Sequence, residues 1–166
     1  IHLQNLHIFE VENDTVFFSA RAVKANFALL KLFSKEYELT ELTVEEPQGL
    51  ISQNRDSLNF NDLIERFSST EKSPNKKTPL HLNILNIKIL NGRFFYHELV
   101  TPVNYSIKAV TIESPGYRWN VDTMMIAFRL ESGTGTGSIQ GDFTINSKTS
   151  DYALTALVEK FDMNII

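Results

Sequence analysis

Histidine and carboxylate side chains are the residues whose types would suit metal binding or acid–base chemistry here. The sequence has four histidines and no cysteine. No two histidines have the His-x-x-x-His spacing that places both rings on one face of a helix, so we expect no metal site. Glu10, Glu12 and Asp14 alternate, but they lack the glycine and closing glutamate of a calcium-binding EF-hand loop. We interpret these three carboxylates as a solvated turn.

Nucleophilic and phosphate-binding chemistry is not indicated either. The sequence has no Gly-x-Ser-x-Gly motif, which would expose a catalytic serine on a sharp turn. The run Gly133-Thr-Gly-Thr-Gly137 lacks the Lys-Ser/Thr pair of a phosphate-binding loop, and a strand rather than a helix is predicted after it. A hairpin turn is favoured because glycine readily adopts positive φ angles. We therefore expect a protein that is not an enzyme and uses no cofactor.

Charge and hydrophobicity narrow the class of protein further. The 166 residues include 16 basic and 20 acidic side chains, and 42% of the residues are hydrophobic. A nucleic-acid-binding protein would be expected to carry a basic patch, and none is visible. No apolar run reaches the ~20 residues of a membrane-spanning helix. We expect a globular fragment of a longer chain, because the sequence begins with Ile1 instead of methionine.

Alternation of apolar and polar residues predicts that most of the chain is β-structure. Ile139, Phe143 and Ile145 alternate with polar residues, and Met124 begins a similar segment. Such a pattern indicates strands with one apolar and one polar face. The expected strands are Leu3–Phe9, Thr15–Val23, Glu38–Glu45, Leu82–Leu90, Arg93–Leu99, Tyr105–Ile112, Met124–Glu131, Ile139–Asn146 and Tyr152–Glu159. We predict an α+β, mainly β fold with a twisted, largely antiparallel sheet.

Two short helices are expected to pack on this sheet. The first, about residues 26–34, consists of good helix formers after Asn26, which can cap the helix. The second, about residues 60–68, has apolar side chains at i, i+3, i+4 and i+7 starting from Phe60. Each is too short to be stable alone in water.

The chain is expected to form a single domain, residues 1–166. Residues 68–79 contain no large apolar side chain and include two prolines, so we predict an exposed linker. It would separate a unit at 1–67 from a unit at 80–166.

A short pattern, Leu-x-x-Leu-x-Ile loosely read, occurs four times in the sequence. The copies are Leu3/Leu6/Ile8, Leu39/Leu42/Val44, Ile84/Ile87/Ile89 and Ile107/Val110/Ile112. The step of three residues breaks strict alternation and predicts a strand whose phase shifts once, as in a β-bulge. Three copies are followed by a breaker, at Pro47, Gly92 and Pro115, and there we expect the strand to lead into a turn. The alternative is a chance recurrence in a strand-rich chain.

These segments resemble AsmA-like proteins. Leu85-Asn-Ile-Lys-Ile-Leu-Asn-Gly-Arg-Phe-Phe-Tyr96, followed by the strand Tyr105–Ile112, is similar to the family's recurring unit of strand, Asn/Asp-Gly and aromatic strand. The order of a strand at 16–23, a leucine-rich helix and a strand ending in Pro47 is also similar. Asn54–Leu63 resembles the family's Asp-Gly-x-Asn-Trp-x-x-Leu segment, with Ser57 in place of glycine and Phe60 in place of tryptophan. The resemblance covers most of residues 1–112.

The resemblance implies a role in the cell envelope of Gram-negative bacteria. AsmA-like proteins are typically anchored in the inner membrane by one N-terminal helix, with the rest in the periplasm. They are associated with outer-membrane assembly and phospholipid transport, and are related to chorein-type proteins that carry lipids along an apolar β-groove. The resemblance therefore implies phospholipid acyl chains and neighbouring β repeats as partners, and membrane contact only through an anchor preceding Ile1.

Aromatic residues are abundant, with 12 Phe, 5 Tyr and 1 Trp. Consecutive aromatics in a strand point to opposite faces of the sheet. We predict that one set of apolar residues lines a groove or a seam against a neighbouring segment. The predicted residues are Ile87, Ile89, Phe94, Phe95, Tyr96, Ile107 and Val110. The alternatives are a sheet covered on both faces within the domain, and a structural or interaction module of the envelope without a lipid ligand.

Overall fold

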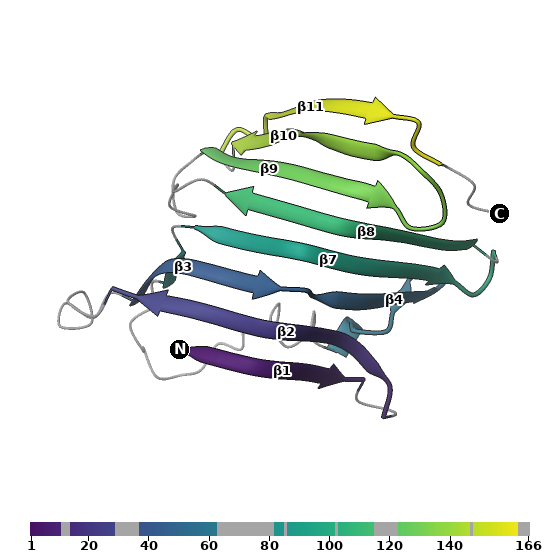
Figure 1. Cartoon of the computed structure of the whole chain (residues 1–166), viewed down its shortest axis with the longest axis horizontal. Coiled ribbons are helices and arrows are strands. Elements are labelled where there is room, and N and C mark those ends of the chain that lie inside the picture. The colour runs from purple at the N-terminus through teal and green to yellow at the C-terminus, as the bar shows by residue number, and fades with distance from the viewer. Residues whose placement is uncertain are drawn as a thin grey trace.

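In the part of the chain that the structure describes, eleven strands form one twisted sheet. The structure, a computed structural model, describes residues 1–10, 14–28, 37–62, 82–84, 86–101, 103–114, 123–146 and 148–162. The strands are β1 (His2–Phe9), β2 (Val16–Phe27), β3 (Tyr37–Glu45), β4 (Gln48–Asn54), β5 (Ser57–Leu58), β6 (Leu82–Ile84), β7 (Ile87–Glu98), β8 (Val103–Ser114), β9 (Thr123–Ser132), β10 (Ser138–Asn146) and β11 (Tyr152–Glu159). The long strands lie side by side, from β1 at one edge to β11 at the other (Figure 1). The prediction of a mainly β chain is confirmed.

The sheet is mixed. Its main path runs β11-β10-β9-β8-β7-β3-β2, with β1 paired to the outer side of β2. Most neighbours are antiparallel, but β3 is parallel to β6 and β7, and β4 is parallel to β7. Strands from both sides of the predicted linker therefore pair directly in the centre of the sheet. The linker itself, residues 68–79, lies outside the described residues.

No complete helix occurs among the residues that the structure describes. Asn26, the expected helix cap, lies in β2 and pairs with Glu41, and Phe27 pairs with Leu39. The predicted helix start is therefore wrong, because pairing with β3 outweighs the helix propensity of this segment. The rest of that helix, residues 29–34, lies outside the described residues. Of the second helix, Asn61 and Asp62 are helical, and residues 63–68 lie outside the described part.

The sequence suggested that the strands before Pro47 and Gly92 lead into turns. The structure has no turn at either residue. Asn91 has a φ of 56°, and β7 continues through it as one strand instead of two. Beside it, Glu46 has a φ of 49°, and β4 continues the direction of β3. The amide of Glu46 donates to the carbonyl of Leu90 at 2.8 Å, so the two irregular segments remain hydrogen-bonded to each other. Where turns were expected, the sheet has β-bulges and kinks, which increase its local twist.

The predicted phase shift inside each repeat is confirmed. In the first and fourth copies a residue with positive φ lies between the first two apolar positions: Asn5 at 53° and Ala109 at 50°. In the second copy, β3 has an extra residue opposite the Asn26/Phe27 step. In the third, the break between β6 and β7 lies at the corresponding place. The spacing of three residues therefore marks strand irregularities that recur across the sheet.

One row of cross-strand neighbours crosses eight strands with apolar residues or glycine only. The row, called the apolar row below, is Leu3, Val23, Val44, Ile89, Ile112, Phe128, Gly141 and Ala156. Directly paired residues project from the same face of a sheet. The eight residues therefore lie on one face.

The residues next to the apolar row form a second row on the opposite face. This row, called the polar row below, is His2, Lys24, Thr43, Lys88, Glu113, Ala127, Asp142 and Thr155. It is polar at every position except Ala127. The alternation predicted from the sequence thus extends as two matched rows across the sheet.

Few apolar side chains are buried in the part of the chain that the structure describes. They are Ala20, Ala22, Leu39, Val110 and Pro47. A closed β-sandwich would bury one face of each sheet in a core about 10 Å thick. The described strands instead form one open sheet, whose apolar face is only partly covered.

Candidate functional site

Six of the seven predicted groove residues lie on the face of the apolar row. Ile89 belongs to that row, and Ile87 lies two residues before it in β7. A Cβ atom placed on Gly92 would lie 2.9 Å from Phe94 Cε2 and 3.4 Å from Val110 Cβ, so these two side chains share a face. Val110 is two residues from Ile112 of the apolar row, which places the pair on the row's face.

Ile107 and Tyr96 complete this group of six. Ile107 pairs directly with Phe94, and Tyr96 follows Phe94 by two residues in β7. Val110 is only 3% exposed, so it supports the surface from below instead of lining it. The other five are partly exposed. The six residues form a continuous apolar surface over β7 and β8.

Phe95, the seventh predicted residue, projects from the opposite face. It pairs with Leu50 of β4 and Ser106 of β8, and it is 46% exposed. Strand alternation separates it from Phe94 and Tyr96. The structure therefore does not bring all seven predicted residues together.

The apolar surface continues over β9, β10 and β11, which the sequence-based site did not include. Three further rows of direct partners extend it: Met124–Ile145–Tyr152, Ile126–Phe143–Leu154 and Leu130–Ile139–Val158. The sharp alternation in these strands was the signal available in the sequence. What it lacked was the pairing register, which joins these strands to β8 through Ile112 and Phe128.

Tyr96 and Tyr105 on this surface have hydrogen-bond acceptors for their hydroxyl groups. Tyr96 Oη donates to Gln53 Oε1 at 2.8 Å, and Tyr105 Oη donates to the carbonyl of Asp162 at 3.3 Å. Partial burial raises the pKa of the Tyr105 hydroxyl. Phe161 packs near Tyr105, with ring centroids 6.2 Å apart. The polar tips are thus satisfied while the rings contribute apolar area.

Ion pairs characterise the opposite face in the centre of the sheet. Glu45 accepts hydrogen bonds from Lys24 and Arg21, and Arg21 Nε lies 2.7 Å from Glu46 Oε1. The hydrogen bond from Lys24, with the charges of Lys24 and Arg21, lowers the pKa of the Glu45 carboxyl. The hydrogen bond to Glu46 and the charge of Glu45 raise the pKa of the Arg21 guanidinium. These residues tie β2 to the kink between β3 and β4.

Lys88 forms a second ionic cluster beside the first. Its Nζ lies 3.3 Å from Glu41 Oε2 and 3.5 Å from Glu113 Oε1, so it links β7 to β3 and β8. The hydrogen bond to Glu41 and the adjacent charges raise the pKa of the Lys88 ammonium. Both of these partners carry the opposite charge, which indicates that Lys88 has a structural role on a solvated face.

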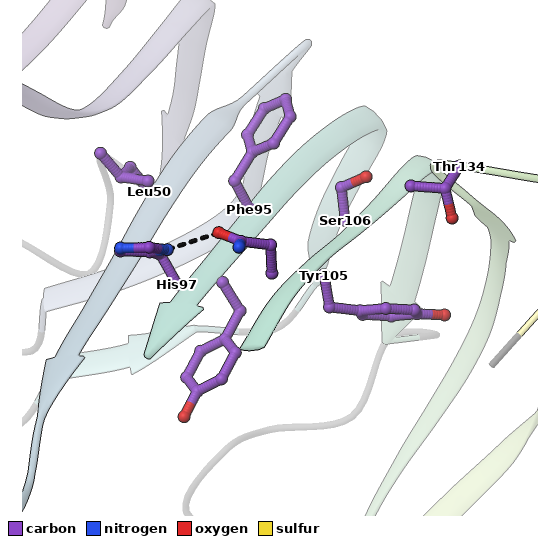
Figure 2. A pocket seen from close by; sticks show the side chains of 8 residues that line it. Leu50, Phe95, His97, Tyr105, Ser106 and Thr134 are labelled. Atoms are coloured by element: carbon purple, nitrogen blue, oxygen red, sulfur yellow. Dashed lines mark hydrogen bonds between the residues drawn. The ribbon is translucent and has the colours of Figure 1, made fainter. Parts of the chain in front are cut away.

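A hollow lies beside Phe95, away from the ionic clusters, and Tyr96 and Tyr105 of the apolar surface are also among its lining residues. It is a cavity of about 360 Å³ with Leu50 and Phe95 as apolar walls, and with His97 and Asn104 at its side (Figure 2). A neighbouring cavity of about 340 Å³ shares Leu50 and Phe95 and reaches Phe17. No pattern in the sequence indicated this hollow, because its residues come from β4, β7, β8 and the loop before β10.

In the described ranges, no group of three or more His, Asp or Glu side chains is arranged to hold a metal ion. No helix within these ranges is long and apolar enough to cross a membrane.

No protein-family model matches the chain, and no curated protein shows significant sequence similarity to it.

Proposed function

We propose that this chain is a non-enzymatic, AsmA-like periplasmic segment whose apolar sheet face binds phospholipid acyl chains. In this proposal the parent protein is anchored in the inner membrane of a Gram-negative envelope and takes part in outer-membrane assembly or phospholipid transport. The observation that supports it most is the apolar row, which crosses eight strands without a polar side chain.

The shape of this face supports acyl chains over a compact ligand. Large exposed apolar surfaces on a protein commonly mark an interaction site. Here the surface extends from β1 to β11 and is not confined to one pocket, and the hydroxyl groups of Tyr96 and Tyr105 are already hydrogen-bonded. An acyl chain is long, flexible and without polar atoms, and therefore needs no specific hydrogen bond.

The hydrophobic effect is large enough to hold such a chain. Burying ~100 Å² of acyl-chain surface would contribute about 2.5 kcal/mol. A longer chain that crosses several strands would bury more area. Each row of partners adds apolar contacts, so binding would be distributed over many residues instead of depending on one site.

Strand β11 offers a direct test, because it carries leucines of similar exposure on both faces. Leu154 is 61% exposed and pairs with Phe143 on the apolar face. Leu157 is 54% exposed and pairs with Gln140 on the polar face. Neither substitution removes a buried side chain, so both Leu154→Asp and Leu157→Asp are expected to fold.

The experiment measures binding of a fluorescently labelled phosphatidylethanolamine that comigrates with the protein in gel filtration. Leu154→Asp should reduce the bound lipid several-fold, because a carboxylate must be desolvated beside an acyl chain. Leu157→Asp should bind as the unchanged chain does. Equal effects of the two variants, or no lipid on the unchanged protein, would contradict the proposal. The second outcome would favour the alternative, an envelope scaffold or protein-interaction module without a lipid ligand.

A further inference from the structure

Strand β11 forms an open edge of the sheet. It pairs with β10 on one side, and in the part of the chain that the structure describes no strand pairs with its other side (Figure 1). Every residue from Tyr152 to Glu159 is exposed. An open edge presents unpaired backbone N–H and C=O groups, to which another strand can bind.

The register with β10 determines which backbone groups of β11 face outward. The amide of Asn146 donates to the carbonyl of Asp151 at 2.8 Å, and the next pair along the ladder is Ile145 with Tyr152. Because hydrogen-bonded pairs alternate along an antiparallel ladder, the odd-numbered residues of β11 bond to β10. The even-numbered residues therefore turn their N–H and C=O groups to the open edge. They are Tyr152, Leu154, Ala156 and Val158.

Edge strands commonly carry charged side chains, proline or β-bulges, which prevent pairing with another chain. Residues Tyr152–Val158 include no charged residue and no proline, and the register of β11 with β10 runs without a shift. Strand β1, at the opposite edge, differs. Asn5 has a φ of 53°, and the register of β1 with β2 shifts between Ile8 and Phe9. The edge at β11 is therefore the one suited to pairing.

The outward groups of β11 are complementary to those of a second copy of the same strand. Consider an antiparallel pair related by a two-fold axis, with Thr155 of each copy on the axis. Tyr152 then lies opposite the partner's Val158, and Leu154 lies opposite the partner's Ala156. All four outward residues of each copy exchange backbone hydrogen bonds, about eight in total. We propose that two copies of this chain pair through β11 in this register, so that one sheet continues through both.

Neighbouring registers would pair fewer of these groups. Moving the axis by one residue, to Leu154 or Ala156, would bring Ser150 or Lys160 into the ladder. These two residues lie outside β11 and have positive φ angles of 60° and 48°. The register centred on Thr155 is therefore the one in which every outward group of the strand has a partner.

This pairing joins the apolar faces of the two copies. Ala156 belongs to the apolar row, and Leu154 projects from the same face. Since direct partners share a face, the two apolar faces would form one surface. Only the ends oppose the pairing, because Asp151 would lie opposite the partner's Glu159 at each end.

A disulfide tests the register directly, because the chain has no cysteine. Thr155→Cys would bring two thiols together at a non-hydrogen-bonded pair, where Cα atoms lie ~4.5 Å apart, within the range that a disulfide spans. Ala153→Cys is the control, since Ala153 is exposed on the same face of the same strand. Its two copies would lie ~14 Å apart. Diamide should therefore cross-link Thr155→Cys at least about tenfold faster than Ala153→Cys on non-reducing gels.

Sedimentation of the unchanged chain measures the strength of pairing. One strand pair buries less area than a standard interface, so we expect a Kd on the order of 100 µM. Glu159→Lys should strengthen pairing about tenfold, because Asp151 then lies opposite a positive charge at both ends. Asp142→Lys makes the same change of charge on β10, and it should leave the Kd unchanged.

Ala156→Pro removes an outward N–H group but no hydrogen bond to β10, so it should abolish dimers while the sheet stays folded. The proposal is overturned if the unchanged chain stays monomeric up to about 1 mM, because the edge would then be left to a different strand. Equal cross-linking of Thr155→Cys and Ala153→Cys would also overturn it, as would dimers that persist in Ala156→Pro. None of these measurements involves lipid, so their failure leaves the proposed acyl-chain surface unaffected.

Discussion

The two faces of β7 and β8 differ although they are made from alternate residues of the same strands. Ile89 and Ile112 are direct partners on one face, and Lys88 and Glu113 are direct partners on the other. The polar partners are joined by an ion pair of 3.5 Å, and Glu41 adds a second contact to Lys88. The apolar partners have no polar contact to make. The charged side chains of one face therefore find their partners within the sheet, whereas the apolar side chains of the other face would gain free energy if they were covered.

The ion pairs of one face and the apolar side chains of the other contribute to the sheet in different ways. Ion pairs between neighbouring strands fix their register at little cost in desolvation, because they remain near water. The apolar side chains gain free energy only when water is removed from them. An open sheet with one charged face can therefore expose its other, apolar face without a second layer of strands or helices packed on it.

The largest expected effect comes from a charge in the middle of the apolar row. Ile112 lies between Ile89 and Phe128. Ile112→Asp should lower the free energy of unfolding by about 3 kcal/mol, because a carboxylate among apolar neighbours has no partner. Glu113→Gln, the adjacent position on the polar face, should change it by less than about 0.5 kcal/mol. Urea denaturation measures both, and similar losses would mean that the two faces are equally covered.

Gly141 provides the next test, as the only member of the apolar row without a side chain. A Cβ atom there would lie 2.0 Å from the carbonyl oxygen of Thr155, which is backbone and cannot rotate away. Gly141→Ala should therefore separate β11 from β10 and cost about 2 kcal/mol. Amide hydrogen exchange should show faster exchange in β11 but not in β7. Unchanged protection of β11 would contradict the close approach of the two strands.

The sequence predicted which residues of a strand share a face better than it predicted where each strand begins and ends. Alternation in 139–146 and the three-residue steps at Leu3 and Ile107 were sufficient to predict strands and their irregularities. The turn expected at Gly92 was wrong, because the strand stays hydrogen-bonded on both sides of it: the Arg93 amide donates to the Pro47 carbonyl, and the Leu90 carbonyl accepts from the Glu46 amide. β4 was missed because Pro47 and Gly49 obscure its pattern, and Asn26 was assigned to a helix although β3 pairs with it.

The candidate site was predictable only in part, because it depends on strand irregularities and strand pairings that the sequence pattern does not specify. Phe94 and Phe95 could be assigned to opposite faces from their adjacency alone. Which of them joins the apolar row depends on the bulges at Asn91 and Ala109, which change the phase of β7 and β8. The hollow beside Phe95 depends on Leu50, whose strand is parallel to β7 and distant in sequence.

On the polar face, pH should affect stability through Glu45. The pKa of this carboxyl is lowered in the folded chain from its ordinary value of 4.5, first by the hydrogen bond from Lys24. Its contribution is therefore fully present above the unfolded pKa and is lost as pH falls through the lower folded value. Glu45→Gln should flatten the dependence of the unfolding free energy on pH below 4.5. An unchanged slope would mean that other carboxylates, such as Glu98, are responsible.

The smallest effect is expected at Lys88, and it should depend on salt. Lys88→Met removes the ion pairs to Glu41 and Glu113, but it keeps a long apolar side chain of similar reach. Since the ammonium is near solvent, its attraction to the carboxylates is screened as the Debye length shortens from about 10 Å at 0.1 M salt to about 3 Å at 1 M. The difference in unfolding free energy between Lys88→Met and the unchanged chain should therefore shrink between these two salt concentrations. The effect of Ile112→Asp should persist, because the lost contacts are apolar. A difference for Lys88→Met that stays constant with salt would show that its methylene groups, and not its charge, stabilise this face.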